Sequence, residues 1–248
     1  MLHWNVHSWR DAAGASNVSR VADLIRAAEP DVVSLVEVNE PWGAPSALAS
    51  VAADCGYGWV FVPSIQFGEP PGRRGYGNAL LSRVPVTDVQ QVDVFTPPGR
   101  YDGSEASEKR SAVVARVGST WVGSTHFPAG SRLARKAAAD ALLDLLRGLS
   151  TPWIVCGDFN AAPSALFAGR TDLLRVYPDS GVPTFPAHRP RVPIDYVLTS
   201  PDVWVSASVL AAGGSDHLPV LGRCQVSQRL ADHEQDVVVQ RVAGVLEQ

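Results

Sequence analysis

The sequence has little cysteine, and the cysteines that it has are poorly placed for a metal site or a disulfide framework. The 248-residue chain holds three, Cys55, Cys156 and Cys224, which lie far apart and form no CxxC pair. An odd number at such spacing argues against a structural zinc site and against a disulfide-stapled scaffold. We therefore expect free thiols in a reducing compartment, which favours a cytoplasmic protein.

Long apolar runs and a strong net charge are also missing. No stretch of about 18 consecutive apolar residues occurs, and the opening MLHWNVHSWR has no apolar core of signal-peptide length. The formal net charge is -4, so no general basic field favours nucleic acid, although a local basic patch stays compatible with that charge. We expect a soluble, cytoplasmic monomer without stable membrane association, and a nucleic-acid substrate is neither implied nor excluded.

Many strands and few helices are distributed along the whole chain. Apolar residues at helical spacing predict helices from 17 up to Pro30, around 46–55 and over 131–149, and short apolar runs between and after them predict strands. No internal repeat or long linker is visible. This mixture predicts one α/β domain with two sheets packed face to face and helices outside, although other layered α/β folds fit the same order.

Polar and ionisable residues stand within or at the ends of several apolar strands. They are Asn5 after LHW, Glu37 in SLVEV, His126 after WVGST, Asp158 and Asn160 in GDFN, Asp195 in PIDYVL, and Asp216 and His217 before LPVLG. Because an unpaired buried carboxylate is costly, we expect these groups to converge on a cation or on water. Carboxylate and amide oxygens without thiolates suit Mg²⁺ or Mn²⁺. Taken singly, each residue also fits a structural role, such as a turn bonded to its own backbone.

Seven motifs, taken together and in order, resemble those of a known family. They are WNV (4–6), PDVVSLVEV (30–38), GNALLSR (77–83), STH (124–126), GDFN (157–160), IDYVL (194–198) and SDHLPV (215–220). Their order resembles the endonuclease/exonuclease/phosphatase superfamily, with its deoxyribonuclease I-like fold. The resemblance implies a four-layered α/β sandwich, with two packed mixed β-sheets, helices on the outer faces and the site at one rim. It assigns residues 1–224 to this domain and leaves 225–248 as a C-terminal polar helix or tail.

The resemblance also implies a metal site and a histidine pair. Glu37 would be the principal ligand of a Mg²⁺ or Mn²⁺ ion, with Asn5 beside it and Asp216 contributing from the opposite sheet. Asp195 would hydrogen-bond His217 and so fix the tautomer of its imidazole. The reaction implied is hydrolysis of a phosphate ester by in-line attack of an activated water. Only four residues precede Asn5, so we expect either a short first strand or a longer natural start than Met1.

Other residues would contact the phosphate or the water by the same resemblance. Asp158 would orient or deprotonate the water or serve the leaving group, and Asn160 would hydrogen-bond a phosphate oxygen. His126 matches a phosphate-contacting histidine of the family. Arg110 would supply a guanidinium, although a surface arginine at a strand start is the alternative. Whether His217 or Asp158 is the general base stays open, as does the number of metal ions.

The substrate is less well determined than the reaction. Arg74 and Tyr76 lie in a loop that could border the site, and Asn78 follows in GNALLSR; each is a candidate substrate contact that also fits a structural role. We favour a phosphoesterase acting on a small or moderate phosphorylated molecule, such as a nucleotide, an inositol phosphate or a phospholipid. A nuclease that cleaves DNA or RNA is the second hypothesis. A non-catalytic binding protein is the third, and the complete set of matched residues disfavours it.

Overall fold

Two six-stranded mixed sheets pack face to face in the part of the chain that the computed structural model describes, residues 1–42, 46–150, 152–170, 172–178, 181–211 and 213–226. The first sheet has the order β11 (Val203–Val209), β12 (Val220–Val226), β1 (Leu2–Asn5), β2 (Val32–Pro41), β4 (Arg74–Ser82), β3 (Gly58–Phe67). The second has the order β5 (Val86–Phe95), β6 (Arg110–Val117), β7 (Thr120–His126), β8 (Trp153–Asp158), β10 (Asp195–Thr199), β9 (Arg175–Tyr177).

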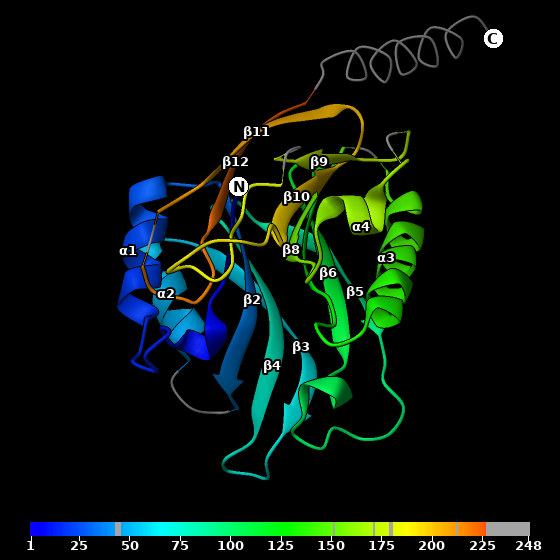
Figure 1. Cartoon of the computed structure of the whole chain (residues 1–248). Helices are drawn as coiled ribbons and strands as arrows, with labels where there is room; N and C mark the ends of the chain where they lie inside the picture. Colours follow the sequence, from blue (N-terminus) through cyan, green and yellow to red (C-terminus); the bar gives the residue numbers. More distant parts are fainter. Residues whose placement is uncertain (43–45, 151, 171, 179–180, 212, 227–248) are drawn as a thin grey trace, which may run out of the picture.

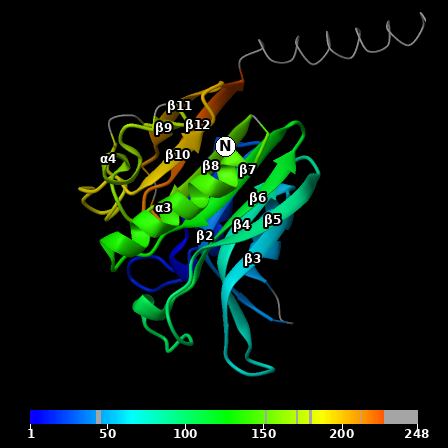
Figure 2. The same cartoon turned by 90° about the vertical axis from the view of Figure 1, so that its right-hand side faces the viewer.

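Helices cover the outer face of each sheet. The helices are α1 (Val18–Ala28), α2 (Ala47–Cys55), α3 (Arg132–Arg147) and α4 (Pro163–Phe167), with short 3-10 turns η1 (His7–Trp9) and η2 (Glu105–Ser107). The first two pack on the first sheet and the other two on the second (Figures 1 and 2). The predicted four-layered α/β sandwich is therefore confirmed.

The long helix α3 shows why the sequence forms these layers. Ser131 caps its start by accepting a hydrogen bond from the backbone N–H of Ala134 at 3.2 Å. Its buried side chains Leu142, Leu143 and Leu146 recur on one face and pack on the second sheet. Each such burial contributes roughly 1.5–3 kcal/mol, so the apolar stripe rather than helix propensity holds α3 in place.

Strand pairing brings the polar strand ends to one rim. β1 runs parallel to β2, and β7 runs parallel to β8 with His126 opposite Asp158. β10 is antiparallel to β8, so its first residue, Asp195, is the register partner of the last residue of β8, Asp158. The short strand β1 is held between β2 and β12, and Asn5 at its end is fully buried.

Several details differ from the sequence-based expectations or go beyond them. β2 continues past Glu37 to Pro41, and β9 and β11 are strands that the sequence analysis did not identify. The three cysteines are free, as expected. No helix within the described ranges is long and apolar enough to cross a membrane. Of the predicted C-terminal tail, residues 227–248 lie outside the described residues.

Candidate active site

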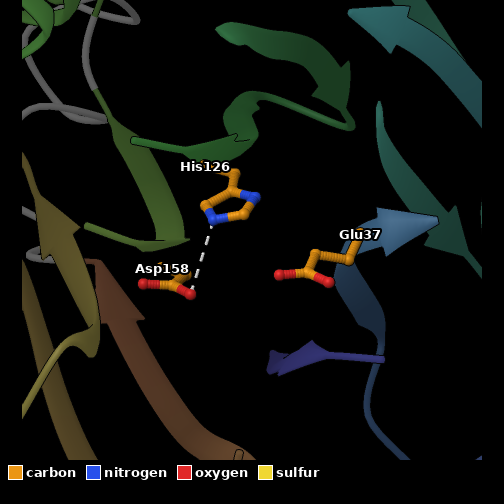
Figure 3. A group of neighbouring side chains, drawn as sticks. All are labelled: Glu37, His126 and Asp158. Atoms are coloured by element: carbon orange, nitrogen blue, oxygen red, sulfur yellow. Dashed lines mark ion pairs between the residues drawn. The ribbon is translucent and has the colours of Figure 1, made fainter. Parts of the chain in front are cut away.

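Glu37 enters the site from a β-bulge in the middle of β2. The register between β2 and β4 shifts between Leu35 and Val38, and Glu37 has a left-handed φ of 56°. A bulge bends its strand and redirects the side chain that it carries. Glu37 is half-buried, and Figure 3 shows its carboxylate pointing toward His126 and Asp158, which come from the opposite sheet.

Asn5 joins the two carboxylates of the site. Its Nδ2 donates to Glu37 Oε1 at 2.9 Å and to Asp158 Oδ2 at 3.1 Å. Its own Oδ1 accepts from the backbone N–H of His7 at 3.0 Å. In this arrangement the amide positions Glu37 and Asp158 with its nitrogen, and its oxygen points away from them. Its predicted role as a metal ligand stays a prediction.

His126 is held by Arg110 and faces the carboxylates with its other nitrogen. Arg110 Nη1 lies 2.9 Å from His126 Nδ1, and both side chains are buried. Because a guanidinium can only donate, Nδ1 accepts and the hydrogen of a neutral ring sits on Nε2. Burial and the Arg110 charge hold the pKa of His126 well below its usual value, so the ring is neutral. Arg110 also pairs with Glu108, a partner that the sequence analysis did not foresee.

Asn160 adds a second donor beside this ring. Its Nδ2 lies 3.1 Å from His126 Nε2 and donates to the carbonyl of Phe127 at 2.9 Å. Since Nε2 carries a hydrogen, the two nitrogens are both donors and do not satisfy each other. Two adjacent N–H groups facing the same space form a favourable place for an anion.

His217 and Asp195 form a second group, joined by a short hydrogen bond. His217 Nδ1 lies 2.8 Å from Asp195 Oδ2, and Thr184 Oγ1 donates to the same oxygen at 2.5 Å. Burial alone would lower the pKa of His217, but Asp195 and Asp158 outweigh it and raise that pKa to about 10. Burial would likewise raise the pKa of Asp195, but His217 holds it well below its usual value. His217 is therefore a cation that can donate from both nitrogens.

Backbone and ring contacts fix the segment that carries His217. Trp4 Nε1 donates to the carbonyl of His217 at 2.9 Å, and Ser215 Oγ donates to the carbonyl of Asn5 at 2.7 Å. The ring of Phe185 packs against the imidazole, with 4.7 Å between ring centroids. These contacts tie the segment to the end of β1, so that His217 and Asn5 keep a fixed relation.

Asp158 lies at the centre of the arrangement, with the cationic His217 at ion-pair distance but, in the described part of the chain, without a hydrogen bond from a charged side chain. Its Oδ2 is 3.6 Å from both His126 Nε2 and His217 Nε2, beyond hydrogen-bond distance. Burial, with a further contribution from Asp195, raises the pKa of Asp158 to about 7. A buried carboxylate whose charge is this poorly compensated is a natural partner for a cation or for a proton in transfer.

The residues fit a divalent metal ion. Glu37, His126 and Asp158 form a group whose side-chain ligand atoms lie within 4.8 Å of one another, and its two carboxylates are oxygen donors of the kind that such an ion prefers. Within the described residues, the group that hydrogen-bonds to both Glu37 and Asp158 is the neutral amide nitrogen of Asn5, which leaves negative charge for a hard cation to neutralise. His126 suits this site as a hydrogen-bond donor, because its Nε2 carries a hydrogen.

Asp216 lies apart from these groups of three within the described part of the chain. Its Oδ1 lies 3.2 Å from Ser215 Oγ, whose hydrogen goes to the carbonyl of Asn5, and 3.7 Å from His7 Nδ1, and its side chain is 29% exposed. The carboxylate is thus accessible at the rim, next to His217 in sequence. Its predicted part in metal binding stays a prediction.

The three predicted substrate contacts occupy different environments. Tyr76 lies near the site, with its ring centroid 5.9 Å from the Arg110 guanidinium carbon, and burial together with Glu37 raises its pKa. Asn78 is buried and donates to the carbonyl of Ser111 at 2.7 Å, which ties the sheets together. Arg74 donates to Asn39 Oδ1 at 2.6 Å. Tyr76 is therefore the one of the three that borders the site directly.

Two comparisons with solved structures support the fold. The chain is 25% identical to an endonuclease/exonuclease/phosphatase from Beutenbergia cavernae, with a TM-score of 0.67, over 91% of this chain and 71% of that one. It is 18% identical to a mannosyl-6-phosphatase from Bacteroides thetaiotaomicron, with a TM-score of 0.67, over 90% and 98% of the two chains.

A human protein shares the same architecture. The human nocturnin catalytic domain is 20% identical, with a TM-score of 0.66, over 91% of this chain and 93% of that one. No curated protein matches the sequence. The model of the Endonuclease/Exonuclease/phosphatase family matches residues 2–217. The match spans every residue of the rim from Asn5 to His217, and the chain belongs to the endonuclease/exonuclease/phosphatase family, whose members are phosphoesterases and nucleases.

Proposed function

We propose that this protein is a divalent-metal-dependent phosphoesterase that hydrolyses a small or moderate phosphorylated molecule by in-line attack of water. The observation that carries the proposal is the setting of Asp158. This buried carboxylate lies between Glu37 and Asn5 on one side and the donors His126 and His217 on the other. Such a centre combines a place for a cation, donors for an anion and a base.

The phosphate would be bound by donors on both sides of Asp158. His126 Nε2 and Asn160 Nδ2 would donate to one phosphate oxygen and His217 Nε2 to another, while Arg110 keeps the His126 tautomer fixed. A Mg²⁺ or Mn²⁺ ion held by Glu37, with Asn5 and Asp216 as further predicted ligands, would supply positive charge to the phosphoryl group.

The attacking water would be oriented by Asp158. Its raised pKa makes it a better base than an ordinary carboxylate, whereas His217 is already protonated at neutral pH. We therefore assign proton acceptance to Asp158 and phosphate stabilisation to the His217 imidazolium. Asp195 keeps that imidazolium oriented through Nδ1.

Two structural neighbours are consistent with phosphoester chemistry on a small substrate. One is a mannosyl-6-phosphatase, and the nocturnin catalytic domain binds a sulfate anion, which resembles phosphate in shape and charge. Both are distant relatives, and the proposal rests on the donors around Asp158.

The test is hydrolysis of a chromogenic phosphomonoester, a chromogenic phosphodiester and plasmid DNA, each with Mg²⁺, Mn²⁺ or chelator. We expect metal-dependent turnover of a small ester in wild type, loss of turnover in Glu37→Gln and His217→Ala, and weakened metal binding only in Glu37→Gln. Glu29→Gln alters an exposed carboxylate outside the site and serves as the matched control for Glu37→Gln.

The outcomes separate the three hypotheses. Plasmid cleavage well above small-ester turnover would favour the nuclease over the small-molecule enzyme. Undiminished turnover in folded Glu37→Gln and His217→Ala would show that the site lies elsewhere. Absence of turnover on all three substrates, with metal binding intact, would point to a binding protein or to a narrower substrate.

A further inference from the structure

A line of buried polar side chains crosses between the two sheets beneath the site. It begins at His3 on β1, whose Nδ1 lies 3.0 Å from Ser34 Oγ on β2. Ser34 Oγ donates to Ser124 Oγ on β7 at 2.8 Å, and Ser124 Oγ donates to the carbonyl of Leu35 at 3.3 Å. All three polar side chains are fully buried. The proposed hydrolysis does not yet explain why such a line exists here.

The direction of these hydrogen bonds determines what His3 does at its first nitrogen. A serine hydroxyl has one hydrogen. Ser124 gives its hydrogen to the carbonyl of Leu35, so it accepts from Ser34, and Ser34 has no hydrogen left for His3. His3 Nδ1 therefore carries a hydrogen and donates to Ser34, which anchors the ring to both sheets.

The other nitrogen of His3 faces Asp195. His3 Nε2 lies 3.5 Å from Asp195 Oδ1, and both side chains are inaccessible to solvent. Neither atom has a hydrogen-bond partner elsewhere in the described part of the chain. The second oxygen of Asp195 is fully used by His217 and Thr184. Each of the two unpartnered buried atoms thus has the other as its polar neighbour.

We propose that His3 is a positioning residue for the Asp195–His217 pair, and this inference rests on the proposed function of that pair. With a hydrogen on each ring nitrogen, His3 donates from Nδ1 to Ser34 and faces the free oxygen of Asp195 with Nε2–H at an ion-pair distance of 3.5 Å, so the carboxylate is held at both oxygens. The fixed plane keeps Oδ2 aimed at His217 Nδ1. His217 in turn keeps Nε2 directed toward the phosphate.

Two substitutions of His3 separate this role from simple core packing. The amide nitrogen of Gln ends about where Nε2 lies, so His3→Gln keeps a donor toward Asp195 and loses Ser34. The amide nitrogen of Asn ends about where Nδ1 lies, so His3→Asn keeps Ser34 and loses Asp195. Both changes put a neutral amide into the same buried position, which makes them matched controls for each other.

We expect the two variants to differ in turnover although their stabilities are similar. His3→Asn should lower kcat by on the order of 10-fold with KM nearly unchanged, whereas His3→Gln should stay close to wild type. Thr199→Val, which alters a buried threonine at the other end of β10, should lower stability without changing kcat. Equal kcat losses in His3→Gln and His3→Asn would overturn the proposal.

A second readout does not depend on turnover. In chelated protein, the proton shared by His217 Nδ1 and Asp195 should give a downfield NMR signal, because it lies in a short, charge-assisted hydrogen bond. We expect His3→Asn to shift or broaden this signal and His3→Gln to preserve it. An unchanged signal in folded His3→Asn would contradict the positioning role. Because no substrate is needed, this test remains decisive even if wild type hydrolyses none of the esters.

Discussion

Asp195 and Asp158 are opposite each other in register and equally buried, yet their environments shift their pKa values in opposite directions. Each is 1% exposed, and each stands at the rim end of its strand. The pKa of Asp195 lies well below its usual value, whereas that of Asp158 is raised to about 7. Burial disfavours the ionised form of both carboxyl groups, so the difference between their pKa values comes from their partners.

Asp195 has a hydrogen bond from the cationic His217, and Asp158 has none from a charged group in the described part of the chain. Asp195 accepts from His217 and Thr184 and faces His3. Asp158 has the amide of Asn5 and one backbone N–H, and its nearest imidazole nitrogens are 3.6 Å away. The half of the site around Asp195 is therefore a finished, rigid element. The half around Asp158 is open to a cation, a substrate or a proton.

The largest effect should follow from changing the open half. Asp158→Asn removes the proposed base, and we expect turnover to fall by on the order of 10⁴-fold. The free energy of unfolding at pH 8 should be unchanged or increased, because the substitution also removes a poorly compensated buried charge. Turnover assays and urea unfolding in chelator check both expectations, with the exposed Asp144→Asn as control. A large loss of stability would show that the Asp158 charge is better compensated than its contacts indicate.

The equivalent change in the finished half should affect stability as well as activity. Asp195→Asn leaves His217 without its charged partner, and we expect about 3 kcal/mol of destabilisation and a loss of turnover on the order of 10²-fold. Urea unfolding of wild type, Asp158→Asn and Asp195→Asn in parallel measures the contrast. Equal free energies of unfolding for Asp158→Asn and Asp195→Asn would contradict the distinction between the two halves of the site.

The sequence predicted the layers and the rim better than it predicted the contacts. The three long helical patterns correspond to α1, α2 and α3, because an amphipathic stripe is a local property. β9 is only three residues long, too short for periodicity to identify. β11 reads VWVSASV and alternates between buried and exposed positions, so its pattern was present in the sequence but went unrecognised.

At the site, residue types were predictable and their partners were not. The resemblance of the motifs predicted a hydrogen bond between Asp195 and His217, and in the structure Asp195 Oδ2 and His217 Nδ1 are 2.8 Å apart. The bulge at Glu37 could not be recognised from the apolar sequence of β2, since it arises from pairing with β4. Glu108 comes from a polar loop and Thr184 from the proline-rich stretch VPTFP, and neither sequence marks its residue as a partner of the site. Such partners depend on tertiary packing, and a single sequence carries little signal for them.

The pH dependence of the free energy of unfolding should distinguish the half of the site around Asp158 from the half around Asp195 and His217. The pKa of Asp158 is raised on folding, so its destabilising effect is absent below its unfolded value near 3.9 and develops as pH rises through about 7. The stability of Asp158→Asn relative to wild type should therefore increase between pH 4 and pH 8 in chelator. Urea unfolding across this range measures the difference, and a difference that is flat with pH would contradict it.

His217 makes stability fall with rising pH as Asp158 does, but over a higher pH range, and its charge is stabilising where that of Asp158 is destabilising. Its pKa is raised to about 10, so the stability that it contributes is fully present below its unfolded value near 6.5 and is lost as pH rises through about 10. His217→Gln should therefore be less stable than wild type at pH 6, and the gap should narrow toward pH 10. A gap that is constant over this range would mean that the Asp195 contact does not depend on the imidazolium charge.

The smallest expected effect comes from removing one donor of the finished half. Thr184 Oγ1 donates to Asp195 Oδ2 and lies 3.3 Å from the backbone nitrogen of Asp195. Thr184→Val keeps the shape and loses the hydrogen bond, so we expect about 1.5–3 kcal/mol of destabilisation and only a few-fold lower turnover. His217 still holds the same oxygen and His3 still faces the other, so the carboxylate should stay oriented. If Thr184→Val instead lowers turnover as much as Asp195→Asn, one donor rather than the whole set fixes the orientation of Asp195.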